Sequence, residues 1–207
     1  MRRLAYLLTA VAAAGLLSVG VAADKGKCPI SGRPAKDNVY LVVNGKKVHF
    51  CCPNCPKAYE KKLRVKDEGP STCPVSGRPA KAEHRMIHTT TKKVAFCCPS
   101  CPKAYLKKLG LKLEKGKPGK CPISGRPAKA EQSLVHDGKT IYFCCPNCPK
   151  AYMKKLGVVE DTSGKCPVSG RDADPDNFML VTEAKAVYFC CPNCPKAYAK
   201  KHFGAGK

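Results

Sequence analysis

Sixteen cysteines fall into four groups of one layout, and thiolates grouped in this way are ligands for soft metal ions. In the first group, 22 residues separate Cys28 from Cys51 and Cys52, and Cys55 follows two residues later. The Cys-Pro-Asn-Cys stretch at 52–55 has the spacing of half a zinc site. Because the layout recurs with 22 or 23 intervening residues, it predicts one thiolate site per group. The candidate ligands are Cys28, Cys51, Cys52 and Cys55; Cys73, Cys97, Cys98 and Cys101; Cys121, Cys144, Cys145 and Cys148; and Cys166, Cys190, Cys191 and Cys194.

Two other uses of these cysteines remain open. Disulfides suit an oxidising compartment, although one of the three pairings in each group would join adjacent residues such as Cys51 and Cys52 in strained geometry. A redox pair at Cys52 and Cys55 would lie at a helix N-terminus, where a thiolate is stabilised. The βαβ pattern of a thioredoxin-like enzyme is missing from the sequence, so the redox pair is the weakest of the three hypotheses.

The cysteine groups belong to a longer internal repeat. Each copy opens with Cys-Pro-Ile/Val-Ser-Gly-Arg and closes with Phe-Cys-Cys-Pro-Asn/Ser-Cys-Pro-Lys-Ala-Tyr, and the openings are 45, 48 and 45 residues apart. The repeat predicts four modules, at 26–66, 71–112, 119–159 and 164–204. Polar linkers lie between them, at about 67–72, 114–120 and 160–165. A module of about 40 residues buries too little apolar surface to fold without a metal or disulfides.

A β-hairpin and a short helix are predicted in each module. Asn44-Gly45 in the first copy and Asp137-Gly138 in the third favour two-residue type I′ turns between strands 39–43 and 46–50, and 133–136 and 139–143. The matching dipeptides of the second and fourth copies, Thr90-Thr91 and Glu183-Ala184, do not favour this turn, so those hairpins are predicted less firmly. A helix follows the last cysteine, where proline suits the first turn. The core candidates of the first copy are Ile30, Leu41, Val48, Phe50, Tyr59 and Leu63.

The predicted fold class is α+β, with four small modules that each contain a turn, a hairpin and a helix. This order, with Cys-Pro-Ile/Val-Ser-Gly-Arg and Phe-Cys-Cys-Pro-x-Cys, resembles the YHS/TRASH-type heavy-metal-binding domains, whose pattern is a cysteine, about twenty residues, then Cys-x3-Cys. The resemblance covers residues 26 to the end and implies a treble-clef-like fold used in metal sensing, trafficking or resistance. The matching triads are Cys28, Cys51 and Cys55; Cys73, Cys97 and Cys101; Cys121, Cys144 and Cys148; and Cys166, Cys190 and Cys194.

The sequence departs from that pattern at the presumed fourth ligand. Related domains often carry a second cysteine in the opening turn, where this chain has Ser31 and its counterparts Ser76, Ser124 and Ser169. We therefore expect Cys52 and its counterparts to complete each shell, and a three-thiolate site with an open position is the alternative, since adjacent strand residues face opposite ways. All-thiolate ligands favour Zn²⁺, which we expect first, and also Cu⁺ or another soft heavy-metal ion. No histidine recurs in the repeat, and His49, two residues before Cys51, is the one histidine to examine.

The first 23 residues have the pattern of a secretory signal peptide. Arg2 and Arg3 precede an apolar run that ends in small residues, which predicts cleavage after Ala23. The run is too short to span a membrane and no second one follows. We therefore expect a periplasmic or secreted protein without an integral membrane segment after signal removal. The oligomeric state does not follow from the sequence.

The chain is strongly basic, with a formal net charge of +23. Four divalent ions on sixteen thiolates would lower the charge of the mature chain to about +13, so part of the lysine excess offsets thiolate charge. Basic helices could also bind a polyanion or a protein partner. No motif for catalysis is evident, and we expect an exported metal-binding protein for trafficking, storage or resistance rather than an enzyme. The alternative is a disulfide- or zinc-stabilised basic scaffold that binds a protein or polyanion.

Overall fold

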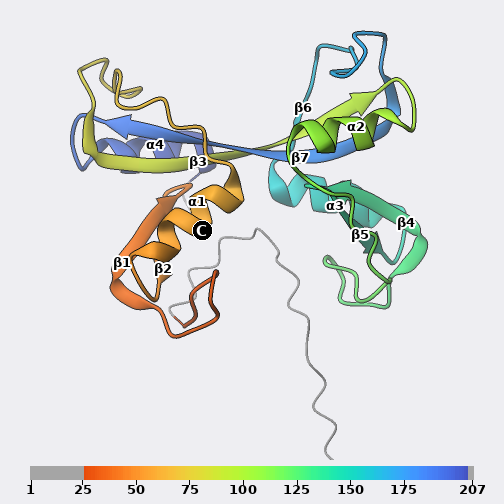
Figure 1. Cartoon of the computed structure of the whole chain (residues 1–207), viewed down its shortest axis with the longest axis horizontal. Helices are drawn as coiled ribbons and strands as arrows, with labels where there is room; N and C mark the ends of the chain where they lie inside the picture. The colour runs from red at the N-terminus through yellow and green to blue at the C-terminus, as the bar shows by residue number, and fades with distance from the viewer. Residues whose placement is uncertain (1–25, 205–207) are drawn as a thin grey trace, which may run out of the picture.

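The computed structural model describes residues 26–204, and Figure 1 shows a long two-stranded ribbon that joins two lobes. The predicted signal peptide lies outside the described residues. The fold combines α and β structure in one curled sheet with four helices, which agrees with the predicted mixture of elements. No helix within 26–204 is long and apolar enough to cross a membrane.

The two hairpins with favourable turn dipeptides form as the sequence predicts. Strand β1 (Lys36–Val43) pairs antiparallel with β2 (Lys46–Phe50), and β4 (Lys129–His136) pairs in the same way with β5 (Lys139–Phe143). Both residues of each turn have positive φ, 50° and 80° at Asn44-Gly45 and 48° and 81° at Asp137-Gly138. These values suit the type I′ turn, which asparagine, aspartate and glycine adopt at low cost.

The second and fourth copies form no hairpin in the described structure. Each instead contributes one 16-residue strand, β3 (Lys81–Phe96) and β7 (Asp174–Phe189), and the two strands pair antiparallel along their length. This ribbon crosses the middle of the molecule (Figure 1). The second and fourth copies therefore exchange strands within one chain, as two subunits do in domain swapping.

The hairpins add to the two edges of the ribbon and complete the sheet. Its strand order is β2-β1-β3-β7-β4-β5, with parallel contacts at Val43 with Ile87 and at His136 with Leu180. The short strand β6 (Val159–Glu160) pairs with β3. Each hairpin turn is held on the ribbon by a 2.9 Å hydrogen bond to its side chain. The amide oxygen Oδ1 of Asn44 accepts from the backbone N–H of Thr89, and the carboxylate oxygen Oδ1 of Asp137 accepts from that of Thr182.

A helix follows each closing cysteine motif, as predicted. The helices are α1 (Asn54–Leu63), α2 (Cys101–Lys108), α3 (Asn147–Leu156) and α4 (Cys194–Phe203). Each helix begins at the last cysteine of its motif or one residue before it, and lysines occupy its last turn, where positive charge is favoured by the helix dipole.

Five small clusters rather than one large core bury the apolar side chains of the described residues. In four of them, a fully buried phenylalanine precedes a cysteine pair and packs edge-on against a tyrosine of the following helix, with ring centroids 5.4 to 5.5 Å apart. The phenylalanines are Phe50, Phe96, Phe143 and Phe189, and their partners are Tyr59, Tyr105, Tyr152 and Tyr198, respectively. Buried cysteines belong to the same clusters, so the candidate metal ligands are part of the core.

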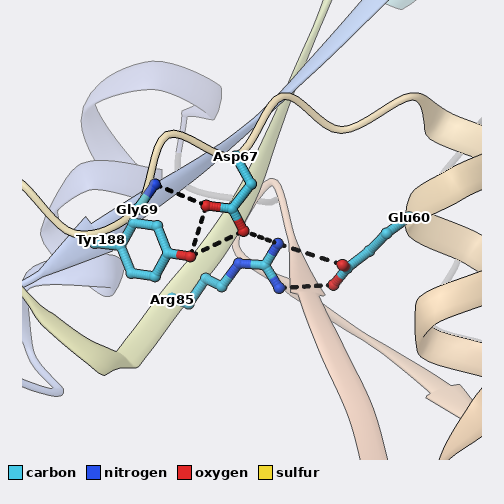
Figure 2. A network of polar contacts seen from close by, with 5 residues as sticks. All are labelled: Glu60, Asp67, Gly69, Arg85 and Tyr188. Atoms are coloured by element: carbon cyan, nitrogen blue, oxygen red, sulfur yellow. Dashed lines mark hydrogen bonds and ion pairs between the residues drawn. The ribbon is translucent and has the colours of Figure 1, made fainter.

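A polar network joins α1 to the ribbon and to the first linker (Figure 2). Arg85 of β3 donates to both carboxylate oxygens of Glu60, at 2.7 and 3.3 Å, and to Asp67 at 2.9 Å. Asp67 also accepts from the hydroxyl of Tyr188 on β7 and from the Gly69 N–H. Parts of the first, second and fourth copies are thereby held together.

Candidate metal centres

Four groups of three cysteines lie close enough for each to hold one metal ion. Within each group the three Sγ atoms are all within 4.8 Å of one another. The groups, called triads below, are Cys28, Cys51 and Cys55; Cys73, Cys190 and Cys194; Cys97, Cys101 and Cys166; and Cys121, Cys144 and Cys148. All twelve are candidate ligands from the sequence, and the cysteines are free thiols in the structure.

Three local structures position the ligands of the first triad. Cys28 begins a tight turn in which its N–H donates to the carbonyl of Arg33 at 2.8 Å. Cys51 directly follows β2, and Cys55 lies in the first turn of α1. The Sγ atoms of Cys51 and Cys55 are 3.6 Å apart, and the corresponding distance is also 3.6 Å in the other three triads.

Ligands in two of the triads come from different copies of the repeat. Cys73, which opens the second copy, meets Cys190 and Cys194 of the fourth, and Cys166 of the fourth meets Cys97 and Cys101 of the second. The expectation that the second and fourth copies each enclose their own triad is therefore wrong. The physical reason is the β3–β7 ribbon, which carries the end of each strand away from the cysteine that opens its own copy. The first and third copies do enclose their own triads.

The second residue of each Cys-Cys pair, called the fourth cysteine below, is not a member of a triad. Its sulfur lies beside only one edge of the group, 3.2 to 3.4 Å from the Sγ of the helical cysteine three residues later. These cysteines are Cys52, Cys98, Cys145 and Cys191. Each group within 4.8 Å thus contains three sulfurs, and a further thiol lies alongside it.

A serine that was not among the predicted site residues supports every triad. The hydroxyl of Ser31 lies 3.1 Å from the Sγ of Cys51, and it also hydrogen-bonds to Cys28. The counterparts Ser76, Ser124 and Ser169 lie 3.1 to 3.2 Å from Cys190, Cys144 and Cys97. Hydrogen bonds to ligand atoms orient them and adjust metal affinity. Recurrence of serine in the opening turn of all four copies was the signal that could have suggested this role.

The cysteine that opens each triad is stabilised as a thiolate. Burial raises the pKa of Cys28, but hydrogen bonds from the Ser31 hydroxyl and from nearby backbone amides outweigh burial and lower the pKa to about 6. The same balance lowers the pKa to about 6 at Cys73 and Cys121 and to about 5 at Cys166. One thiolate is therefore present near neutral pH before an ion arrives.

The helical cysteine keeps its proton in the metal-free triad. The adjacent Cys52 sulfur, burial and the other triad sulfurs together raise the pKa of Cys55 to about 12. The corresponding pKa values of Cys101, Cys148 and Cys194 are also about 12. A bound cation would reverse this preference, so binding must release protons.

The histidines lie outside the triads. His49 contacts the backbone carbonyl of Lys36 at 3.4 Å and packs near the Tyr40 ring. His136 and His88 bond to tyrosine hydroxyls of α3 and α4, respectively. Among residues 26–204, the groups able to hold an ion are the four cysteine triads.

Comparison of the chain with protein families, with curated proteins and with solved structures found no match. The functional argument therefore depends on the geometry of the triads. Three buried or half-buried sulfurs, close together and repeated four times, can bind soft or borderline cations.

Proposed function

We propose that this protein is an exported metal-binding protein that holds soft or borderline ions on cysteine thiolates for trafficking, storage or resistance. The observation that carries the proposal is the recurrence of a three-sulfur group at four places. Zn²⁺ is the first candidate, and Cu⁺ or another soft heavy-metal ion is the second. The four ions are cargo, and we propose no catalytic step.

The sulfur geometry supports ions of this size. Two thiolates bound tetrahedrally at the usual Zn–S length lie about 3.8 Å apart. The 3.6 Å between Cys51 and Cys55 is close to that value without any rearrangement. The third sulfur, that of Cys28, lies within 4.8 Å of both, so small side-chain rotations suffice to bring all three onto one ion.

Two features of the sequence extend the proposal. The resemblance to YHS/TRASH-type domains, with its treble-clef-like fold, includes the Cys-x3-Cys pair that contributes two ligands to every triad. The predicted signal peptide suggests that metal is bound in the periplasm or outside the cell. In either place, free thiols are prone to oxidation to disulfides, and bound metal protects them from this oxidation.

The burial of the triads favours a second candidate function, in which zinc is purely structural. Cys28 is 2% exposed and Cys55 is 7% exposed, and both pack against Phe50. Such a scaffold would present its basic helices to a protein or polyanion. The two functions differ in one measurable respect, because a carrier keeps its fold when the ions are exchanged, whereas a structural site unfolds when its metal is removed.

Native mass spectrometry of the mature protein, residues 24–207, tests the proposal. We expect four ions on the protein purified in reducing buffer with zinc, and free thiols at every cysteine after chelation and denaturation. The matched variant C28S/C51S/C55S should bind one ion fewer. A metal-free protein whose mass is lower by two hydrogens for each of several disulfides would contradict the proposal. Circular dichroism during chelation separates a carrier from a structural site.

A further inference from the structure

The fourth cysteine of each motif has a position that the three-thiolate triad leaves unexplained. We propose that Cys52, Cys98, Cys145 and Cys191 are exchange ligands, through which an ion passes between its triad and a thiol-bearing acceptor or donor. This inference rests on the proposed metal-binding function and deepens it. The acceptor is defined by its chemistry, as a molecule with one or more free thiolates.

Contact with one edge of the triad is the first observation. The sulfur of Cys52 is 3.4 Å from that of Cys55, and it also interacts with Cys51. The equivalent distances to the helical cysteine are 3.2, 3.4 and 3.4 Å in the other three sites. An ion held by the triad therefore lies within a short displacement of a fourth thiolate, although that thiolate is outside the group of three.

Exposure is the second observation. Cys28 and Cys55 are buried, whereas Cys51 and Cys52 are half-buried. Pro53 and Asn54, which follow Cys52, are exposed. The Cys52 side of the site is consequently the side from which a molecule in solution can reach the ion.

The difference in exposure gives the direction of the exchange, from the buried Cys28 toward the half-buried Cys52. A bond forms between the ion and the Cys52 sulfur, whose proton is released, and the bond from the ion to Cys28 breaks. The ion is then held by Cys52 and neighbouring thiolates at the exposed side, and an acceptor thiolate replaces them one at a time. No electrons are transferred in these steps.

The test uses the full mature protein loaded with Zn²⁺ and a chromogenic dithiol chelator as acceptor. In the variant C52S/C98S/C145S/C191S we expect four ions to remain bound, with affinity within about threefold of the wild type, and transfer to be slower by about tenfold or more. In C52S alone, a quarter of the released zinc should show the slow phase. The control E68S places a serine at an exposed residue of the first linker, and it should transfer zinc at the wild-type rate.

Two outcomes would overturn the inference. If affinity falls in the quadruple variant as much as the transfer rate, or if X-ray absorption shows the sulfur count at zinc falling from four to three, then Cys52 is a full member of the shell. If the rate is unchanged, the fourth thiol has no part in exchange. A wild-type protein that binds no zinc would instead disprove the proposed function itself, so the two failures are distinct.

Discussion

Thr90 of β3 and Glu183 of β7 are paired across the antiparallel ribbon. Each lies where the hairpin of its own copy was expected to turn, and neither copy has an Asn-Gly or Asp-Gly dipeptide there. Without residues that favour positive φ, neither strand turns back on itself. β3 and β7 instead pair with each other, in place of the hairpin that each copy would otherwise form. The site composition in the second and fourth copies is a consequence of this choice.

Cleavage of the chain between the second and third copies should leave its halves together. A specific protease site inserted between Gly116 and Lys117 lies in an exposed linker, where an added Cβ at Gly116 would meet no neighbouring atom. Because β3 pairs with β7 and two triads combine ligands from both halves, the cut zinc-loaded protein should elute as one particle in size-exclusion chromatography. Addition of a chelator should weaken that association.

A matched cut supplies the control for this experiment. Cleavage in the first linker, at the exposed Glu68, separates the first copy, whose triad is its own. Chelation should affect retention of that fragment less, because no triad joins it to the remainder. Separation of the zinc-loaded halves after the central cut would show that the copies do not exchange strands.

Substitution of Gly138 by alanine should destabilise the third hairpin. Gly138 has φ of 81°, and an added Cβ would collide with the carbonyl oxygen of Lys112. The left-handed backbone and the collision together should lower the free energy of unfolding by about 2 to 4 kcal/mol. Gly157→Ala is the control, since its φ is 61° but no atom lies near the added Cβ, and about 1 kcal/mol is expected. Urea denaturation that gives equal losses for the two variants would refute the close approach.

Ser31→Ala should weaken metal binding in the first site without removing it. The hydroxyl lies 3.1 Å from the Cys51 sulfur and also bonds to Cys28. Loss of such supporting hydrogen bonds lowers metal affinity by about ten- to a hundredfold. Competition with a zinc chelator should show one of four ions released early, while the exposed Ser133→Ala variant behaves as the wild type. Four indistinguishable ions in Ser31→Ala would mean that the serine is not a supporting residue.

Arg85→Met should cost more stability than the loss of an exposed ion pair. Arg85 bonds to Glu60 and Asp67 while its side chain is 24% exposed (Figure 2). Glu60 and Asp67 then lose their bonds to the guanidinium, although Asp67 keeps those from Tyr188 and Gly69, and we expect the free energy of unfolding to fall by about 2 kcal/mol. The comparison is Lys165→Met, which breaks an exposed pair with Asp172 and should cost less than about 0.5 kcal/mol. Similar losses in thermal or urea unfolding would show that the network contributes little.

Acid should destabilise the ribbon through His88. Burial first, and then the positive charges of Lys185 and His202, lower the pKa of His88 to about 4. Tyr198, Thr90 and Phe203 also face its ring. Because the folded pKa lies below the ordinary value of about 6.5, the stabilisation is complete above pH 6.5 and is lost as the pH falls toward 4.

The variant His88→Gln measures this contribution against the wild type. Both proteins are zinc-loaded, so the effect of acid on the cysteines is common to them. The difference in unfolding free energy between the two should change by about 1 kcal/mol from pH 7 to pH 5, a value reduced for the half-exposed ring. A constant difference across this range would contradict the assignment.

Local features were predictable because short-range rules determine them. Asn44-Gly45 and Asp137-Gly138 specify their turns through backbone preference, and proline after cysteine marks each helix start. The triads of the first and third copies follow directly, since a hairpin returns the chain to its opening cysteine. Ile30 was expected in the core but is 36% exposed, because the opening turn lies at the surface.

The exchange of strands was not predictable from one repeat considered alone. A hairpin and an exchanged ribbon bury the same phenylalanines and place cysteines of the same type together, so the pattern of apolar residues does not distinguish them. The signal that favours exchange is the poor turn at Thr90-Thr91 and Glu183-Ala184, which argues against a hairpin but does not identify another partner for the strand. Whether two strands without turn-forming residues pair with each other depends on how the rest of the chain positions them.

The exchanged ribbon also determines the order in which the triads can form, because the chain is synthesised from its N-terminus. The first triad can close as soon as Cys55 has emerged, and the third as soon as Cys148 has. Cys97 and Cys101 must wait for Cys166, and Cys73 must wait for Cys190 and Cys194. The cysteine that opens the second copy thus stays without its partners while more than a hundred further residues appear, and α4 completes the site that Cys73 began.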